Sequence, residues 1–344
     1  MKKYINWGVI GLGNAARAFS SGFENSINSK LLAVASKNDE KRFYFKKKFN
    51  LQDKYLYKSY EELISNKEID IVYIALPHTM HKEWILKSAN LKKNVLVEKP
   101  ATLSINDLKE IIEVVKSNNV FFSEGLAYRY HPFYLQLLSI IKKINPKKID
   151  SIKASFGNDA IGGKKIFGLR LKKPSRNKRL FNPELGGGAI WDSGCYPVSF
   201  VRQIICAVNK TNSYFRPLII NAKKKYGSTG VDEYSSLKLQ FNETIVEINT
   251  SINETLDNTI EIYLSNGKII IYNPWFPSND TYIEVLIENK SQIIKCLDNV
   301  SAYKKEIEII SDLLLKGKKE QKYPFITLED IILNIEILEK WEKF

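Results

Sequence analysis

A glycine turn near the start of the chain constrains the fold more than any other feature. The residues Gly11-Leu12-Gly13-Asn14-Ala15-Ala16 follow the apolar run Tyr4–Ile10 and open a segment of helical pattern. In this context the first glycine permits a tight turn, the second lets the backbone approach a pyrophosphate, and the small Ala16 allows close helix–strand packing. Helix N-terminal amides would bind the phosphate charge. We therefore expect a dinucleotide site at Gly11, Gly13, Asn14, Ala15 and Ala16, the alternative being a turn used only for packing.

The first 125 residues alternate strand-like and helix-like segments. Their apolar runs, such as Asp70–Ala75 and Val95–Val97, are continuous rather than alternating, which predicts strands buried on both faces of a parallel sheet with crossover helices. Ser104 and Asp107 resemble a capping box that opens one of these helices. We predict an α/β fold in which residues 1–125 form a doubly wound, parallel Rossmann domain.

The pattern changes after Pro132. Apolar and polar residues alternate strictly in Leu237–Phe241 and Ile260–Leu264, and Asn266-Gly267 indicates a tight hairpin. Such alternation predicts an antiparallel sheet with one free face. Residues 126–344 are expected to form a substrate-binding and oligomerisation α/β domain with an open, mostly antiparallel sheet. Its last helix could pack back on the Rossmann domain.

Charge and composition exclude several classes of partner. The formal charge is +14, but the basic residues are mostly lysines spread along the chain, whereas a nucleic-acid surface concentrates arginine and aromatics. No apolar run approaches the roughly 20 residues needed to cross a bilayer. The three cysteines, Cys195, Cys206 and Cys296, form neither a metal pattern nor a disulfide framework. We expect no nucleic-acid or membrane partner and a cytoplasmic location.

The end of the second predicted strand bears on the choice of cofactor. An NAD site usually has an acid here for the ribose hydroxyls, whereas this chain has Ala35-Ser36-Lys37-Asn38. A hydroxyl followed by a cation suits a 2′-phosphate, so Ser36 and Lys37 favour NADP. The nearby Asp39 keeps NAD possible, and Lys37 could be an ordinary solvated lysine.

Three later segments complete a family pattern. They are Glu98-Lys99-Pro100, Glu124–Pro132 and Gly186–Pro197. With the glycine turn they resemble the Gfo/Idh/MocA family, which includes glucose–fructose oxidoreductase and inositol dehydrogenase, over almost the whole chain. The resemblance implies hydride transfer between nicotinamide and a secondary hydroxyl or carbonyl of a sugar or polyol-like substrate. It also implies a homo-oligomer, a dimer or tetramer, paired through the C-terminal sheet.

The resemblance also assigns the proton-handling residues. Lys99 corresponds to the active-site lysine, and a positioned base or proton relay contributes about 10²–10⁴-fold to such reactions. Tyr196 stands where many members have histidine. A tyrosine at this position resembles the branch with pyranose and xylose dehydrogenases and dihydrodiol dehydrogenase. Asp192 would orient substrate hydroxyls or the phenol, since residues four apart share a helix face. Pro197 weakens that inference, and a tyrosine that only packs in the core is the alternative.

The remaining site residues follow from the same resemblance. Leu76, Pro77, His78 and His81 belong to a loop beside the cofactor, and Glu98 and Lys99 of the Glu-Lys-Pro segment are also expected to contact the cofactor. A His-x-x-His pair also raises a metal site, but no third ligand stands at a matching spacing, so we expect no metal. Arg129 and Trp191 are expected with Asp192 at the substrate, although Arg129 could instead be a structural ion-pair partner.

Two other functions remain open at this point. A similar fold supports NAD-dependent glycosidases or eliminases that oxidise, eliminate and reduce without net turnover of the cofactor. The other alternative is a protein without enzymatic activity, either a dinucleotide sensor or a nucleic-acid-binding protein, which the positive charge would favour.

Overall fold

The computed structural model describes residues 3–162, 165–166, 169–170, 172–209, 216–288, 290–296 and 300–344. The chain divides into two units. The first comprises Met1–His131 and Val300–Ile332, and the second comprises Pro132–Asn299 and Leu333–Phe344. Pro132–Asn299 of the second unit are thus inserted, in sequence, into the first unit, and Leu333–Phe344 follow it.

A six-stranded sheet forms the centre of the first unit. Its strands are β1 (Ile5–Ile10), β2 (Ser29–Ala35), β3 (Leu56–Tyr57), β4 (Ile71–Ile74), β5 (Asn94–Glu98) and β6 (Phe122–Gly125). The spatial order is β3-β2-β1-β4-β5-β6, and every adjacent pair is parallel. This is the doubly wound dinucleotide-binding order, which reverses between β1 and β4; ligands of such sheets bind outside the carboxyl ends at that point. The prediction of a parallel Rossmann sheet is confirmed.

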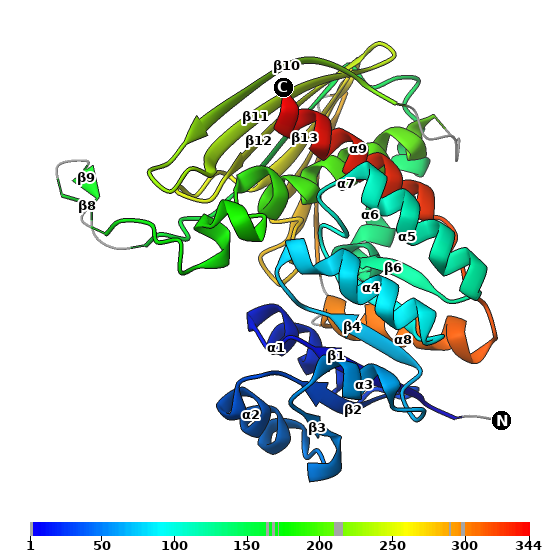
Figure 1. Cartoon of the computed structure of the whole chain (residues 1–344). Coiled ribbons are helices and arrows are strands. Elements are labelled where there is room, and N and C mark those ends of the chain that lie inside the picture. Colours follow the sequence, from blue (N-terminus) through cyan, green and yellow to red (C-terminus); the bar gives the residue numbers. More distant parts are fainter. Residues whose placement is uncertain are drawn as a thin grey trace. The chain divides into compact units, whose positions relative to one another are not determined.

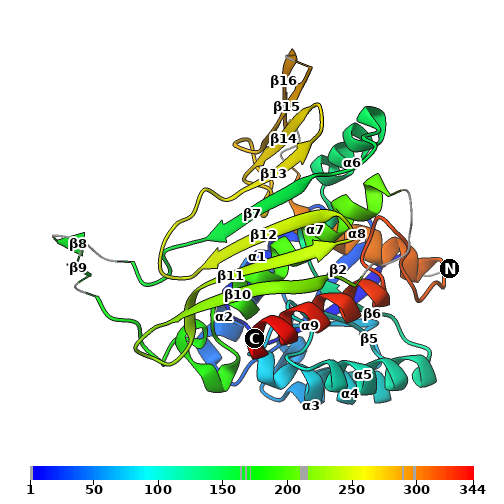
Figure 2. The same ribbon diagram turned by 90° about the horizontal axis from the view of Figure 1, so that it is seen from above.

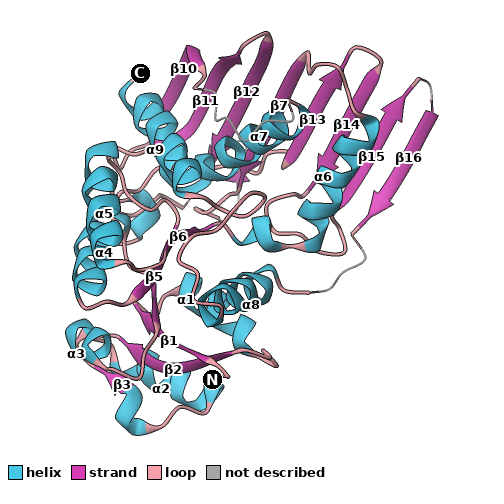
Figure 3. Cartoon of the chain, turned by 90° about the vertical axis from the view of Figure 1, so that its right-hand side faces the viewer, coloured by secondary structure: helices cyan, strands magenta, loops and turns pink. Residues whose placement is uncertain are grey.

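Helices cover both faces of this sheet. They are α1 (Asn14–Ser20), α2 (Asp39–Phe49), α3 (Tyr60–Ser65), α4 (His81–Asn90), α5 (Ile105–Asn118) and α8 (Ala302–Leu315). Figure 3 shows the sheet between α3, α4 and α5 on one side and α1 and α8 on the other. Trp7, Val9 and Ile10 of β1 are almost wholly buried, because helices pack against both faces of their strand.

The second unit is built on an eight-stranded sheet. Its strands are β7 (Ser151–Gly157), β10 (Leu218–Tyr226), β11 (Asp232–Phe241), β12 (Thr244–Ser251), β13 (Thr259–Leu264), β14 (Gly267–Tyr272), β15 (Tyr282–Ile287) and β16 (Lys290–Lys295). They lie in the order β10-β11-β12-β7-β13-β14-β15-β16 (Figure 2), and only the pair β12 and β7 is parallel. The mostly antiparallel sheet and the hairpin at Asn266-Gly267 are confirmed.

Helices line one face of this second sheet. They are α6 (Pro132–Ile144), α7 (Cys195–Val208) and the end of α9 (Leu328–Lys343), whose Trp341 indole donates to Ser236 O of β11 at 3.1 Å. Figure 1 also shows the two-residue strands β8 (Lys165–Ile166) and β9 (Leu169–Arg170). Within the described part of the chain, none of the helices combines the length and apolar character that a bilayer span requires.

Candidate active site

The two glycines of the first turn meet different surroundings. Gly11 has φ of +83°, and a Cβ there would lie 2.4 Å from the carbonyl oxygen of Ala75, after β4. A Cβ on Gly13, the residue before α1, would meet no protein atom within 4 Å. The protein's own backbone therefore requires the first glycine, whereas the second borders open space. Asn14 and Ala15 are exposed beside it, and Ala16 is buried against the fold.

The start of α1 also suits an external anion. Four other helices of this unit, α2, α3, α5 and α8, begin with a side chain that accepts from a first-turn amide: Asn38, Ser59, Ser104 and Ser301. Gly13 offers α1 no such cap. Open space in front of uncapped amides fits the pyrophosphate of a dinucleotide, so the residues present fit the predicted cofactor.

An arginine that the sequence analysis did not identify binds the residues that follow β2. Arg42 is buried and donates both to the carbonyl oxygen of Ser36 and to the carboxylate of Asp39. Ser36 is buried, and its hydroxyl accepts from the amide of Asn38 at 3.2 Å. Lys37, the residue between them, is exposed. The acid that kept NAD possible is therefore held in an ion pair.

Side chains from three segments contact the residues on either side of Lys99. Tyr73 of β4 donates its hydroxyl to Glu98. The amide of Ala101 donates to Glu124 Oε1 of β6 at 2.8 Å, and the carbonyl oxygen of Pro100 lies 2.9 Å from His81 Nδ1. Lys99 itself is half-buried, and its peptide bond to Pro100 is cis. The segment at the carboxyl end of β5 is thus fixed from both sides.

Burial makes several groups near Glu98 resist ionisation. It raises the pKa of the Tyr73 hydroxyl well above its ordinary range, and the Glu98 carboxylate raises it further. Burial, and then Glu98, likewise raises the pKa of Glu306 on α8 well above its usual value. Tyr73 therefore acts as a hydrogen-bond donor, and Glu306 favours the neutral form.

The loop after β4 reaches the Lys99 segment through one histidine. His81 Nε2 lies 3.0 Å from the carbonyl oxygen of Leu76, while its other ring nitrogen faces Pro100. Leu76 and His78 are buried, Pro77 is half-buried, and the rings of His78 and His81 are 5.6 Å apart. No group of three His, Cys, Asp or Glu side chains that could hold a metal occurs among the described residues. Both nitrogens of His81 are already opposed to carbonyl oxygens.

In the second unit, the predicted substrate residues precede α7 on a π-helical turn, Ile190–Gly194. Trp191 is buried, and the half-buried carboxylate of Asp192 accepts from Arg179 Nη2 at 2.5 Å. The expectation that Asp192 and Tyr196 share one helix face assumed α-helical spacing. The wider π turn changes that spacing, so the shared-face argument does not apply here.

Tyr196 lies in the first turn of α7, within an aromatic cluster. Its ring centroid is 5.2 Å from that of Phe156, 5.5 Å from Phe276 and 6.4 Å from Trp275. The tyrosine is 7% exposed, whereas Phe276 is 55% exposed. Pro197 is the next residue of α7, close to the π-helical turn at Ile190–Gly194.

A buried aspartate that the sequence reading missed holds the π turn. Asp232 of β11 accepts from the amide of Ile190 at 2.9 Å and from the hydroxyl of Ser235 at 2.7 Å. A Cβ on Gly188, whose φ is +117°, would lie 2.1 Å from Asp232 Oδ1. Burial raises the pKa of Asp232 to about 7. The glycine run is therefore required by a carboxylate that approaches the backbone closely.

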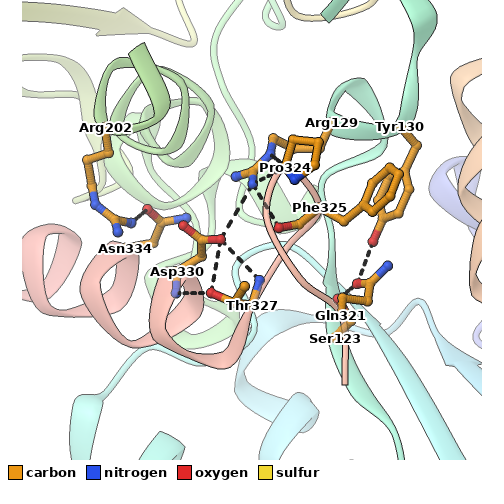
Figure 4. A network of polar contacts seen from close by, with 10 residues as sticks. All are labelled: Ser123, Arg129, Tyr130, Arg202, Gln321, Pro324, Phe325, Thr327, Asp330 and Asn334. Atoms are coloured by element: carbon orange, nitrogen blue, oxygen red, sulfur yellow. Dashed lines mark hydrogen bonds and ion pairs between the residues drawn. The ribbon is translucent and has the colours of Figure 1, made fainter. Parts of the chain in front are cut away.

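Arg129 lies in a buried network of the first unit (Figure 4). Its side chain is fully buried and donates to the carbonyl oxygens of Pro324 and Phe325. Its Nη2 lies 3.5 Å from Asp330 Oδ2. Asp330 and Thr327 exchange hydrogen bonds with each other's amides at 3.0 and 3.1 Å, which forms a capping box at the start of α9. These contacts support the structural reading of Arg129.

Comparison with known proteins agrees with this geometry. Residues 5–126 match the model described as Gfo/Idh/MocA "Oxidoreductase family, NAD-binding Rossmann fold", and residues 150–270 match the C-terminal domain of the same family. Trans-1,2-dihydrobenzene-1,2-diol dehydrogenase of Xenopus tropicalis is 27% identical over 97% of this chain and 96% of its own length. D-xylose 1-dehydrogenase (NADP(+)) of Hypocrea jecorina is 25% identical over 85% of this chain and 78% of its own.

Solved structures share the fold over nearly the full length. KijD10, a 3-ketoreductase from Actinomadura kijaniata in complex with NADP and TDP-benzene, superimposes with a TM-score of 0.84 at 18% identity, covering 99% of this chain and 97% of its own. An aldose-aldose oxidoreductase from Caulobacter crescentus, complexed with glycerol, has the same TM-score at 16% identity and the same coverage of both chains. At these identities the likeness is one of fold.

Proposed function

Because the chain belongs to the Gfo/Idh/MocA family of NAD-binding oxidoreductases, we propose that it oxidises or reduces a sugar or a cyclic diol with NADP. The observation that carries this proposal is the Lys99 segment, fixed at the carboxyl end of β5 by Tyr73, His81 and Glu124. The substrate class rests on the dehydrogenases of xylose and of a dihydrodiol to which the chain is similar.

The cofactor would lie along the carboxyl ends of β1, β2 and β4. The proposed contacts are Gly11, Gly13, Asn14, Ala15, Ala16, Ser36, Lys37, Leu76, Pro77, His78, His81, Glu98 and Lys99. Open space at Gly13 supports the pyrophosphate position. NADP is preferred over NAD because Asp39 is engaged by Arg42, while Lys37 is exposed beside Ser36.

The proposed reaction transfers a hydride and a proton, and different groups handle each of them. When bound, the nicotinamide supplies or accepts the hydride. Lys99 and Tyr196 would handle the hydroxyl proton, a role that a positioned acid–base group fills with about 10²–10⁴-fold effect. Asp192 and Trp191 would orient the substrate, with Arg179 fixing the carboxylate of Asp192. Arg129 would act indirectly, through the fold.

Two substitutions test the assignment. Lys99→Ala and Tyr196→Phe should each lower kcat at least 100-fold on the best substrate of a panel of aldoses, cyclic diols and nucleotide-linked sugars. NADP binding, followed by fluorescence, should remain. Lys92→Ala and Tyr226→Phe, at exposed positions, are the matched controls. Near-wild-type rates in both site variants would reject the roles of Lys99 and Tyr196. Release of sugar without net change in nicotinamide absorbance would instead favour redox-assisted glycoside cleavage.

We also propose a cytoplasmic homodimer or tetramer that assembles through the open face of the second sheet. Tyr234, Tyr263 and Tyr272 stand at alternating, partly exposed positions of three strands on that sheet. Tyr263→Glu should shift the mass measured by light scattering towards the monomer, whereas an unchanged mass would contradict pairing through this face.

A further inference from the structure

The imidazole of His81 has an unusual pair of partners. The side chain is fully buried at the start of α4. Its Nδ1 lies 2.9 Å from the carbonyl oxygen of Pro100, and its Nε2 lies 3.0 Å from the carbonyl oxygen of Leu76. Both nitrogens therefore face an oxygen that can only accept.

A neutral imidazole cannot satisfy both contacts. It carries one N–H and one lone pair, whereas the imidazolium carries two N–H donors. In either neutral tautomer, a nitrogen lone pair would point at a carbonyl lone pair about 3 Å away. We propose that His81 is held as the imidazolium and clasps the main chain after β4 to the main chain after β5, thereby positioning Lys99.

The surrounding charges are compatible with a buried cation. Glu124 accepts from Ala101, the residue after Pro100, and so brings a carboxylate to the same segment. The other titratable groups on the segments joined by the ring are His78, whose ring is 5.6 Å away, Glu98 and Lys99. Two charge-assisted hydrogen bonds and the nearby carboxylate offset the cost of burial.

This inference rests on the proposed role of Lys99 and adds a residue that positions it. Pro100 follows Lys99 directly, while Leu76 belongs to the loop proposed to border the cofactor. A proton on His81 therefore connects the two strand ends that would flank the nicotinamide. Loss of that proton would release one carbonyl and loosen the lysine, and misplacement by about 1 Å can cost on the order of 100-fold in rate.

Nuclear magnetic resonance of the full chain labelled with ¹⁵N-histidine tests the protonation state directly. The chain has three histidines, and His81→Gln identifies the signals of His81 by their disappearance. We expect two N–H protons and two imidazolium-type nitrogen shifts for His81 at pH 7.5, above the ordinary imidazole pKa of about 6.5. A single N–H with one unprotonated ring nitrogen at that pH would overturn the proposal.

Kinetics of His81→Gln test the positioning role. The amide can donate from its nitrogen but not from its oxygen, so it can satisfy only one of the two carbonyls. We expect kcat to fall at least 10-fold, with KM for the substrate changed less than threefold. His131→Gln, which replaces a buried histidine facing Val300 O, should retain kcat. An unchanged kcat in folded His81→Gln contradicts the positioning role.

The two measurements separate this proposal from the proposed function. Absence of hydride transfer by the wild-type chain would refute the function, while the resonance measurement would still decide the state of His81. If His81→Gln fails to fold, the wild-type spectrum, assigned instead through His78→Gln and His131→Gln, gives the same decision.

Discussion

The hydroxyl of Tyr73, in β4, donates a hydrogen bond to Glu98, the residue before Lys99. The Tyr73 ring is also stacked on Phe19 of α1, with ring centroids 3.6 Å apart. Core packing thereby fixes the orientation of the ring, and the ring fixes the carboxylate. The helix that follows the glycine turn is thus joined, through one tyrosine, to the segment that carries the proposed catalytic lysine.

Tyr73→Phe tests this connection. We expect the free energy of unfolding to fall by about 1–2 kcal/mol, because a carboxylate oxygen loses its buried donor, and kcat to fall several-fold. Since burial and Glu98 raise the pKa of Tyr73 well above its ordinary value, the hydroxyl remains a donor throughout the neutral range. The stability difference, from urea unfolding, should therefore be constant between pH 6 and 9. A difference that disappears within this range would contradict donation to Glu98.

The two turn glycines should respond differently to alanine. Gly11→Ala forces a side chain into positive φ and against Ala75 O, so we expect a loss of at least about 1–3 kcal/mol in stability. Gly13→Ala meets no protein atom and should change stability by less than about 1 kcal/mol. Its NADP affinity should nevertheless fall at least 10-fold, seen as a smaller rise in Tm with added NADP. Equal NADP affinity in Gly13→Ala and wild type would place the pyrophosphate elsewhere.

Asp232 should make stability depend on pH in an unusual direction. Its pKa is raised to about 7 by burial, whereas an unfolded aspartate titrates near 3.9. Between about pH 4 and 7 the folded chain retains a proton that the unfolded chain has lost. This contribution to stability therefore falls as pH rises through that window and is flat above it.

Asp232→Asn removes this proton while keeping an oxygen that can accept from Ile190. Relative to the wild type, the variant should gain up to about 2 kcal/mol in stability between pH 5 and 7.5, measured by denaturant unfolding at each pH. Asp257→Asn, at an exposed carboxylate, is the control and should parallel the wild type. Parallel profiles for Asp232→Asn as well would show that Asp232 titrates normally.

Arg129 distinguishes a structural arginine from a substrate ligand. Arg129→Lys removes donors from Pro324 and Phe325 and weakens the buried pair with Asp330, so we expect a loss of at least about 2 kcal/mol in stability. KM for the substrate should stay within twofold at temperatures where the variant is folded. Arg216→Lys, in an exposed pair with Glu336, should cost less than about 1 kcal/mol. A raised KM with unchanged Tm would restore Arg129 to the substrate site.

Features that depend on neighbours in sequence were the predictable ones. The glycine turn, the capping box at Thr327 and Asp330, and the alternation in β11 and β13 follow from local spacing, and the fold class and family followed from them. The contact of Asp232 with Ile190 joins residues 42 apart. No periodicity signals such a partner, although the triple glycine shows that something approaches closely. The π turn was also not predicted, because the four-residue spacing of Asp192 and Tyr196 was interpreted as α-helical.

The first unit is formed from two segments, Met1–His131 and Val300–Ile332, and this affects the order in which the chain can fold. Trp7 donates to Ser311, and Arg129 donates to Phe325, so the first unit is incomplete until residues 300–332 exist. A ribosome adds roughly 5–20 residues per second, and at that rate about 10–40 s separates His131 from Ile332. During this interval the nascent N-terminal segment exposes the indole and guanidinium that α8 and the loop after it later cover. The first unit is thus begun first but is completed only near the end of synthesis, and it is the part that a co-translational chaperone would need to protect.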